Sequence, residues 1–164
     1  MKKILLPPLL VLLTLSLLVS CHTGSASPEE VLGELLSVAD PHPAGVTYTS
    51  DADPYGMAPR LDGDLVCALY ARSDGYCEYG ECVESAAVYL GTVADRYFEV
   101  AVLACYGSAD TEAVAAMCLR RAQLVGRGLG LPSGSTVIVT AGRLVILCIS
   151  QDPTLAARLA DAVK

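Results

Sequence analysis

The sequence has few aromatic, histidine and charged residues. It contains no Trp, one Phe and two His, and 18% of its residues are charged. A surface that binds single-stranded nucleic acid stacks bases on aromatic rings beside Lys and Arg, and the formal net charge of −7 opposes a phosphate backbone. With two histidines, a Ser–His or Cys–His catalytic pair has almost no candidates. These scarcities argue against nucleic acid as a partner and against nucleophilic hydrolysis.

Apolar residues, in contrast, are abundant. They make up 53% of the 164 residues, and the mean hydropathy is +0.49. A disordered chain has the opposite composition, with low hydropathy and many charges. The length fits one domain.

The beginning of the chain combines positive charge, an apolar stretch and a cysteine. Lys2 and Lys3 precede residues 4–19, an apolar stretch shorter than the about 20 residues that a membrane-spanning helix needs. It ends in Leu18-Val19-Ser20-Cys21. This ending resembles the lipobox of bacterial lipoprotein precursors, in which the cysteine receives a diacylglycerol and a peptidase then cuts just before it. The small Ser20 suits that cut.

The resemblance divides the chain into three parts. It implies a signal peptide over residues 1–20, a lipidated tether over residues 21–27 with the lipid on Cys21, and one domain over residues 28–164. An uncleaved signal anchor and an ordinary signal peptide are the alternatives. Two acyl chains hold a protein to a membrane stably, whereas one is marginal. Cleavage removes two lysines and no acid, so the acidic domain is expected to stand off an anionic leaflet.

The first part of the domain combines a helix start with a long irregular stretch. Ser27-Pro28-Glu29-Glu30 predicts a helix that begins with a capping box and continues to about residue 39. Residues 40–64 are rich in Pro, Gly and Asp and predict an irregular loop. Residues 65–71 predict a short helix that starts at Asp62 or Asp64.

Two strand–turn–strand–helix units follow. The first unit predicts strands over residues 83–90 and 97–105 and a helix to about Gly126. The second predicts strands over residues 135–140 and 143–149 and a final helix after Asp152-Pro153. The sequence therefore predicts an α+β fold with a four-stranded antiparallel sheet. Both helices are expected on one face of the sheet, and the N-terminal helix beside them or over an edge.

These segments resemble a known family. Residues 65–70, the strand Tyr97-Phe98-Glu99-Val100-Ala101-Val102 and the closing Gly142-Arg143-Leu144-Val145, together with the lipobox, make the chain similar to the small bacterial lipoproteins grouped as domain of unknown function 4358. The resemblance covers roughly residues 45–164. It implies the fold and an envelope location, with the acid Glu99 in a strand and Arg120 or Arg121 late in a helix. The family has no known activity.

Six cysteines remain in the domain, and an even number outside the cytoplasm permits disulfides. Cys77 and Cys82 stand in the turn-rich Gly-Tyr-Cys-Glu-Tyr-Gly-Glu-Cys and are a possible local bridge; otherwise the thiols are expected to be reduced core residues. A zinc site is disfavoured because no second close pair of ligands accompanies them. His22 and His42 are expected to be in solvent.

Three aspartates partly imitate a calcium loop. Asp51, Asp53 and Asp62 have the spacing of positions 1, 3 and 12, with a glycine at position 6. A tyrosine takes the place of one oxygen ligand, and no helix precedes the loop. A solvated turn rich in aspartate is therefore preferred to a metal site.

Glu99 is a charge inside an otherwise apolar strand. It either faces water or pairs with an arginine, and Arg143 on the other hairpin is one possible partner. We prefer a structural ion pair to a catalytic carboxylate. Because no catalytic constellation is apparent, the sequence predicts a lipid-anchored, extracytoplasmic protein without enzyme activity or cofactor, which binds or assists an envelope protein or peptide. A metal- or solute-binding lipoprotein and a carboxylate hydrolase are the alternatives.

Overall fold

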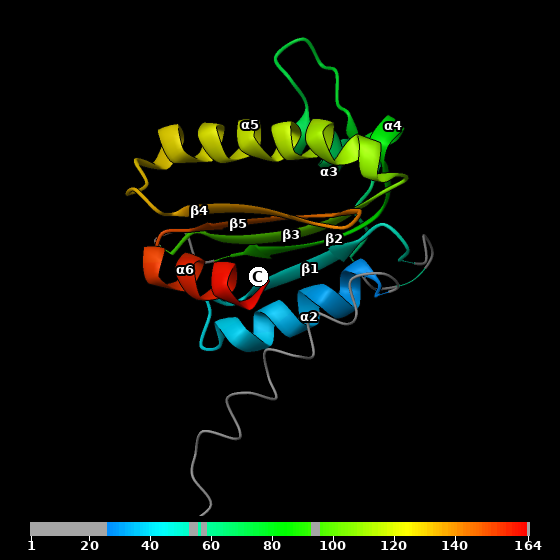
Figure 1. Cartoon of the computed structure of the whole chain (residues 1–164). Helices are drawn as coiled ribbons and strands as arrows, with labels where there is room; N and C mark the ends of the chain where they lie inside the picture. The colour runs from blue at the N-terminus through cyan, green and yellow to red at the C-terminus, as the bar shows by residue number, and fades with distance from the viewer. Residues whose placement is uncertain (1–25, 53–55, 57–58, 93–95, 164) are drawn as a thin grey trace, which may run out of the picture.

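The fold is a five-stranded antiparallel sheet covered by helices on both faces (Figure 1). The computed structural model describes residues 26–52, 56, 59–92 and 96–163. The strand order is β1-β2-β3-β5-β4. The strands are β1 (Gly45–Thr49), β2 (Val83–Gly91), β3 (Phe98–Cys105), β4 (Thr136–Ala141) and β5 (Leu144–Ser150). The predicted α+β class is thus confirmed. The four predicted strands are present, but the prediction of a four-stranded sheet is wrong because β1 adds a fifth strand.

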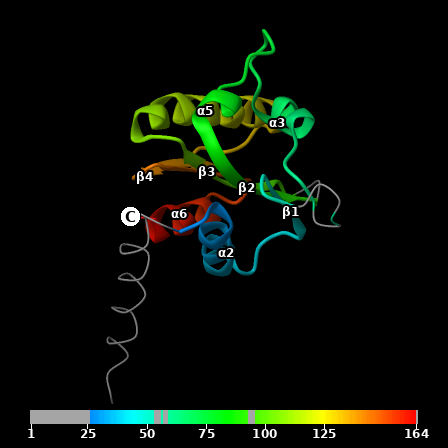
Figure 2. The same ribbon diagram turned by 90° about the vertical axis from the view of Figure 1, so that its right-hand side faces the viewer.

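The helices form two layers, one on each face of the sheet. The first contains α5 (Thr111–Leu129), α3 (Gly63–Tyr70) and the short α4 (Tyr79–Cys82), and a 3₁₀ turn (Ser108–Asp110) precedes α5. The second contains α2 (Pro28–Ala39) and α6 (Pro153–Ala162) (Figures 1 and 2). No helix in the described ranges is both long enough and apolar enough to cross a membrane.

The expectation that both unit helices share one face is wrong. Every residue of β3 and of β5 is buried, so both sides of these central strands are covered. Ala101 and Leu103 contact the core under α5, while Val100 and Val102 contact the core under α2 and α6. One layer of helices cannot cover both faces, and α6 therefore packs on the face opposite α5.

The fifth strand, β1, lies in the segment for which a loop was expected. It pairs along its whole length with β2, from Gly45 opposite Gly91 to Thr49 opposite Ala87. Gly45 is needed there because a Cβ atom would lie 2.3 Å from the Leu90 carbonyl oxygen. The surrounding Pro, Gly and Asp residues obscure this short strand in the sequence.

Local signals set the helix ends. Ser27 and Glu30 form the predicted capping box of α2, and Asp62 caps α3 through the backbone nitrogen of Leu65. The end of α5 lies beyond the predicted Gly126, at Gly130, whose φ of 60° is the left-handed conformation that ends many helices. Leu124 of α5 is 57% exposed, so this leucine does not belong to the buried face of the helix.

Candidate functional site

The most unusual polar group of the core is the carboxylate of Glu99. It lies in the middle strand β3, between Leu90 of β2 and Ile149 of β5, and none of its surface is exposed. Arg121 reaches it from α5, with Nη2 2.8 Å and Nε 3.1 Å from Oε2. The side chain of Arg121 is itself only 12% exposed. The pair therefore links α5 to the centre of the sheet with almost no contact with water.

Two tyrosines complete this cluster, of which Tyr97 is half-buried. Tyr97 donates its hydroxyl hydrogen to Glu99 and accepts a hydrogen bond of 2.8 Å from Arg121 Nη2. Tyr70 of α3 is also buried, and its hydroxyl has no hydrogen-bond partner in the described ranges. Burial, reinforced by the charge of Glu99, raises the pKa of both phenols, so both stay protonated at neutral pH.

The electrostatics of Arg121 favour a permanent ion pair. Burial by itself lowers the pKa of this guanidinium, but attraction to Glu99 and the hydrogen bonds between them outweigh burial, and the pKa is raised. A catalytic carboxylate must reach a substrate, whereas Glu99 is covered on all sides and occupied by Arg121 and Tyr97. This geometry is that of a structural pair.

The predicted partner of Glu99 is wrong. Arg143 pairs instead with Glu84, and both side chains are nearly half exposed. The reason is position along the sheet: Glu99 is opposite Ile149, whereas Leu144, next to Arg143, is opposite Ala104 at the other end of β3. Five residues of strand separate the two places, about 17 Å.

A signal for the correct partner was present in the sequence. Arg121 lies three residues after Cys118 and four before Val125, and both of these apolar residues are buried. This spacing places Arg121 on the face of α5 that packs on the sheet. A long cation on a buried helix face requires an anion, and Glu99 is the only buried carboxylate in the described ranges.

The six thiols of the domain are all free. The possible bridge between Cys77 and Cys82 is therefore not formed, and the Cys77 sulfur lies 3.9 Å from the Met117 sulfur. Burial raises the pKa of Cys105 to about 11 and that of Cys148 to about 12. Thiolates are the reactive form of cysteine, so these two thiols are unreactive at neutral pH.

Two of the three aspartates of the possible calcium loop have other roles. Asp51 accepts a hydrogen bond from Ser50, and Asp62 caps α3. Asp53, like Ser20 and Cys21, lies outside the described residues. Within the part of the chain that is described, no three His, Cys, Asp or Glu residues are grouped so as to hold a metal ion.

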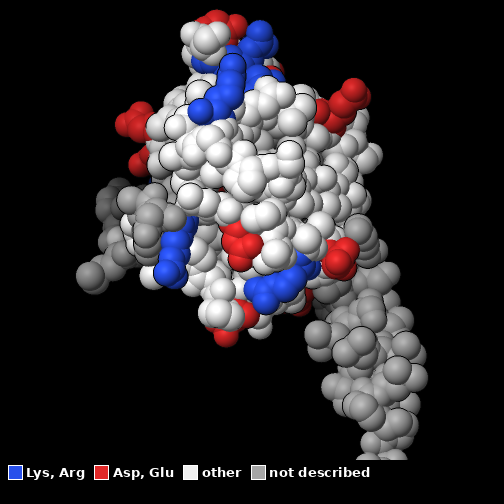
Figure 3. Space-filling model, turned by 90° about the vertical axis from the view of Figure 1, so that its left-hand side faces the viewer, with Lys and Arg blue, Asp and Glu red and all other residues white. Residues whose placement is uncertain are grey.

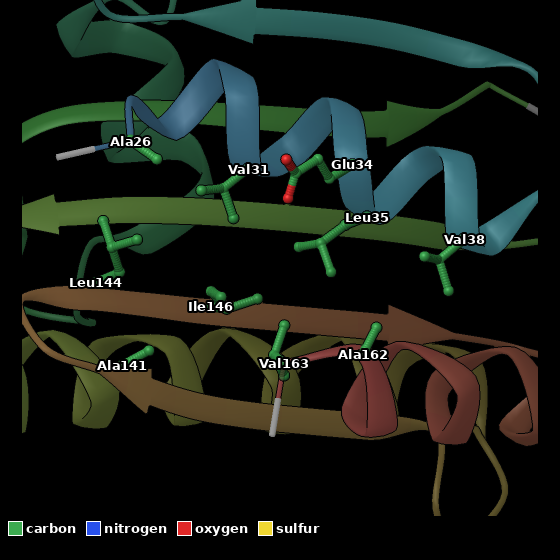
Figure 4. Close-up of a pocket in the computed structure, with 10 residues that line it drawn as sticks. All are labelled: Ala26, Val31, Glu34, Leu35, Val38, Ala141, Leu144, Ile146, Ala162 and Val163. Carbon is green, nitrogen blue, oxygen red and sulfur yellow. The ribbon is translucent and has the colours of Figure 1, made fainter. Parts of the chain in front are cut away.

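An apolar groove runs between α2 and α6 above β5. Figure 4 shows Val31 and Leu35 of α2 on one side, Leu144 and Ile146 of β5 at the base and Val163 after α6 on the other side. Its volume is about 40 Å³. Ligand pockets usually measure about 300–1,000 Å³, so the groove is much smaller than a typical ligand site.

A larger hollow lies where α6 begins. It measures about 480 Å³, and its polar lining includes Arg96, Gln151 and Asp152. His42 also lines it and is half-buried rather than in solvent: its ring stacks on Phe98 with the centroids 5.7 Å apart. Figure 3, which views the side of the molecule where α6 begins, shows charges of both signs scattered over a mainly uncharged surface. The lining of the hollow includes one cation, Arg96, and one anion, Asp152, so neither sign of charge dominates it.

Comparisons with known proteins add no relative. No family model matches the chain, and no curated protein or solved structure matches it significantly. The resemblance to domain of unknown function 4358 remains a prediction.

Proposed function

We propose that this protein is a lipid-anchored, extracytoplasmic protein of the bacterial envelope, and that its folded part is a non-catalytic binding or accessory domain. One observation carries the proposal: an apolar stretch shorter than a membrane span ends in Leu18-Val19-Ser20-Cys21. Charge, length, the small residue and the cysteine all agree with a lipoprotein leader.

The position of the folded domain is compatible with this anchor. Residues 22–27, His-Thr-Gly-Ser-Ala-Ser, separate Cys21 from the first residue of α2. Fully extended, they span roughly 20 Å. A domain held at this distance is close to the bilayer, and its negative charge keeps it from lying flat on anionic lipids.

The state of the strongest acid candidate supports a non-catalytic role. Glu99 is enclosed and paired with Arg121, and burial keeps Cys105 and Cys148 protonated at neutral pH. We therefore expect the domain to bind a partner through its surface residues.

Metabolic labelling with an alkyne analogue of palmitate tests the anchor. The wild-type chain is expected to carry the label and to sediment with membranes, whereas Cys21→Ser loses both properties. Cys67→Ser is the matched control, because Cys67 is an exposed thiol of the folded domain. Unlabelled wild-type protein, or a Cys21→Ser chain that keeps its label, overturns the anchor.

A second candidate function is solute binding in the hollow at the start of α6. Its volume of about 480 Å³ is in the range of ligand pockets, and Arg96 and Asp152 offer opposite charges. These charges suit a zwitterion, so alanyl-alanine at millimolar concentration is a suitable probe. Binding predicts a rise in melting temperature that Arg96→Ala abolishes and Arg127→Ala, at an exposed arginine of α5, retains. No shift in the wild-type chain refutes this candidate for zwitterions of this size.

A further inference from the structure

One edge of the sheet is open. β4 is the last strand in the order β1-β2-β3-β5-β4 and pairs only with β5. The helices α5 and α6 cover its two faces, and Figure 2 shows no described helix or strand beyond its outer side. An uncovered edge presents unpaired backbone N–H and C=O groups to any other extended chain.

The β4–β5 hairpin determines which groups face outward. Ala141 and Leu144 are opposite each other across the two-residue turn Gly142-Arg143, and Ser150 donates a backbone hydrogen bond of 2.8 Å to Ser135. Odd-numbered residues of β4 therefore bond to β5, because the pairs of an antiparallel ladder alternate. The even-numbered residues direct their N–H and C=O groups outward. These are Thr136, Ile138 and Thr140.

The opposite edge of the sheet is partly protected, whereas β4 has no such protection from the residues that the structure describes. At β1, Thr49 exchanges backbone hydrogen bonds with Pro59 and Leu61. β4 has no Pro and no charged residue, although these are common devices against edge pairing. Its apolar side chains, including Ile138, are only partly buried.

The sequence of this edge reads nearly the same in both directions. Residues 134–142 are Gly-Ser-Thr-Val-Ile-Val-Thr-Ala-Gly, and the exchange of Ser135 with Ala141 is the only departure from a palindrome centred on Ile138. A palindromic strand is its own complement in antiparallel pairing, and a two-fold interface brings the same patch of both subunits together.

We propose that β4 pairs antiparallel with β4 of a second copy of this chain, with the two-fold axis at Ile138. Ile138 then lies opposite Ile138 of the second copy, and Thr136 lies opposite Thr140 of the second copy. By symmetry, Thr140 also lies opposite Thr136 of the second copy, which gives three pairs. In each pair the backbone groups of both residues face outward from their own sheets, so the pair exchanges two hydrogen bonds. The two sheets become one continuous sheet.

The side chains fit this arrangement. Val137 lies opposite Val139 of the second copy in the closer, non-hydrogen-bonded type of pair, in which apolar side chains contact well. Because β4 has no charged residue, the pairing brings no like charges of the two strands together. Arg143, just beyond the strand, is paired with Glu84. The pairing covers the half-buried apolar side chains of both edges and does not depend on the lipid anchor.

Cysteine cross-linking of the full-length chain tests the register. With the axis at Ile138, the two Cα atoms of this residue are about 5.5 Å apart, within the range of a disulfide. Ile138→Cys is therefore expected to give a dimer on mild oxidation, above the background of the native cysteines. Thr140→Cys is the matched control, because four residues of strand, about 14 Å, separate it from its copy. Equal cross-linking at both positions, none at either, or a product with a different protein overturns the proposal.

A proline test checks the same edge without cross-linking. The Thr140 N–H faces outward, so Thr140→Pro removes no bond to β5 and the chain is expected to fold. It removes two hydrogen bonds across the axis. The detergent-corrected mass of the full-length chain is expected to be that of a dimer for the wild type and Thr140→Ala, and of a monomer for Thr140→Pro. A monomeric wild type, a series of higher oligomers, or a dimeric Thr140→Pro refutes the pairing.

Discussion

Removing the cation of the buried ion pair should strongly destabilise the domain. In Arg121→Met the side chain keeps much of its length, but Glu99 loses its three hydrogen bonds from the guanidinium and becomes a buried, uncompensated charge. Breaking a buried pair in this way costs about 3–5 kcal/mol. This is a large part of the about 5–15 kcal/mol that stabilises an ordinary domain.

Urea unfolding followed by circular dichroism measures this loss. The midpoint should fall for Arg121→Met with an unchanged slope, since the same surface is exposed on unfolding. At about 3 °C per kcal/mol for a domain of this size, the melting temperature should drop by about 10 °C. Arg127→Met is the matched control: Arg127 lies in the same helix, is exposed and donates a hydrogen bond to the Gln123 carbonyl oxygen. It should cost less than about 0.5 kcal/mol.

A double variant separates charge from packing. Glu99→Leu combined with Arg121→Met leaves no buried charge, so it should be more stable than Arg121→Met alone. If Arg121→Met costs no more than Arg127→Met, or if the double variant loses the sum of the two single losses, the cluster does not act as a coupled buried ion pair.

Three further outcomes are expected. Gly45→Ala should destabilise the domain by about 1–3 kcal/mol because the new Cβ atom meets β2. Gly33→Ala, in an open helical position, should stabilise it by about 0.5–1 kcal/mol. Equal effects of the two variants in urea unfolding would contradict the close approach of Gly45 to β2. Burial raises the pKa of Tyr97, so as pH rises the unfolded chain loses the phenol proton before the folded chain does. The free energy of unfolding should therefore fall as pH rises above about 10. Equal free energies of unfolding from urea titrations at about pH 8 and pH 10.5 would refute this. Iodoacetamide should modify the exposed Cys67 in the native state and the buried Cys118 only after unfolding, as peptide mass spectrometry can show; modification at similar rates would mean that the core opens readily.

Part of the cluster around Glu99 was predictable, and part was not. A carboxylate within an apolar strand indicates an ion pair, and the pair exists. Arg143, the possible partner that the sequence suggests, is not the partner, because the strand register places it near the opposite end of β3 from Glu99. Strand register depends on how segments far apart in the sequence pair with one another. The residues next to Glu99 do not determine which residue of β5 lies opposite it.

The sequence by itself determined the features that depend on neighbouring residues. The Ser27 capping box, the Asp62 cap and the four longer strands follow from contacts within a few positions, so their signals are local. Only the tertiary structure decided that β1 joins the sheet, that α5 and α6 cover opposite faces and that Arg143 lies too far along β3 to pair with Glu99. These outcomes depend on which apolar surfaces and buried charges still need a partner once the whole chain has collapsed.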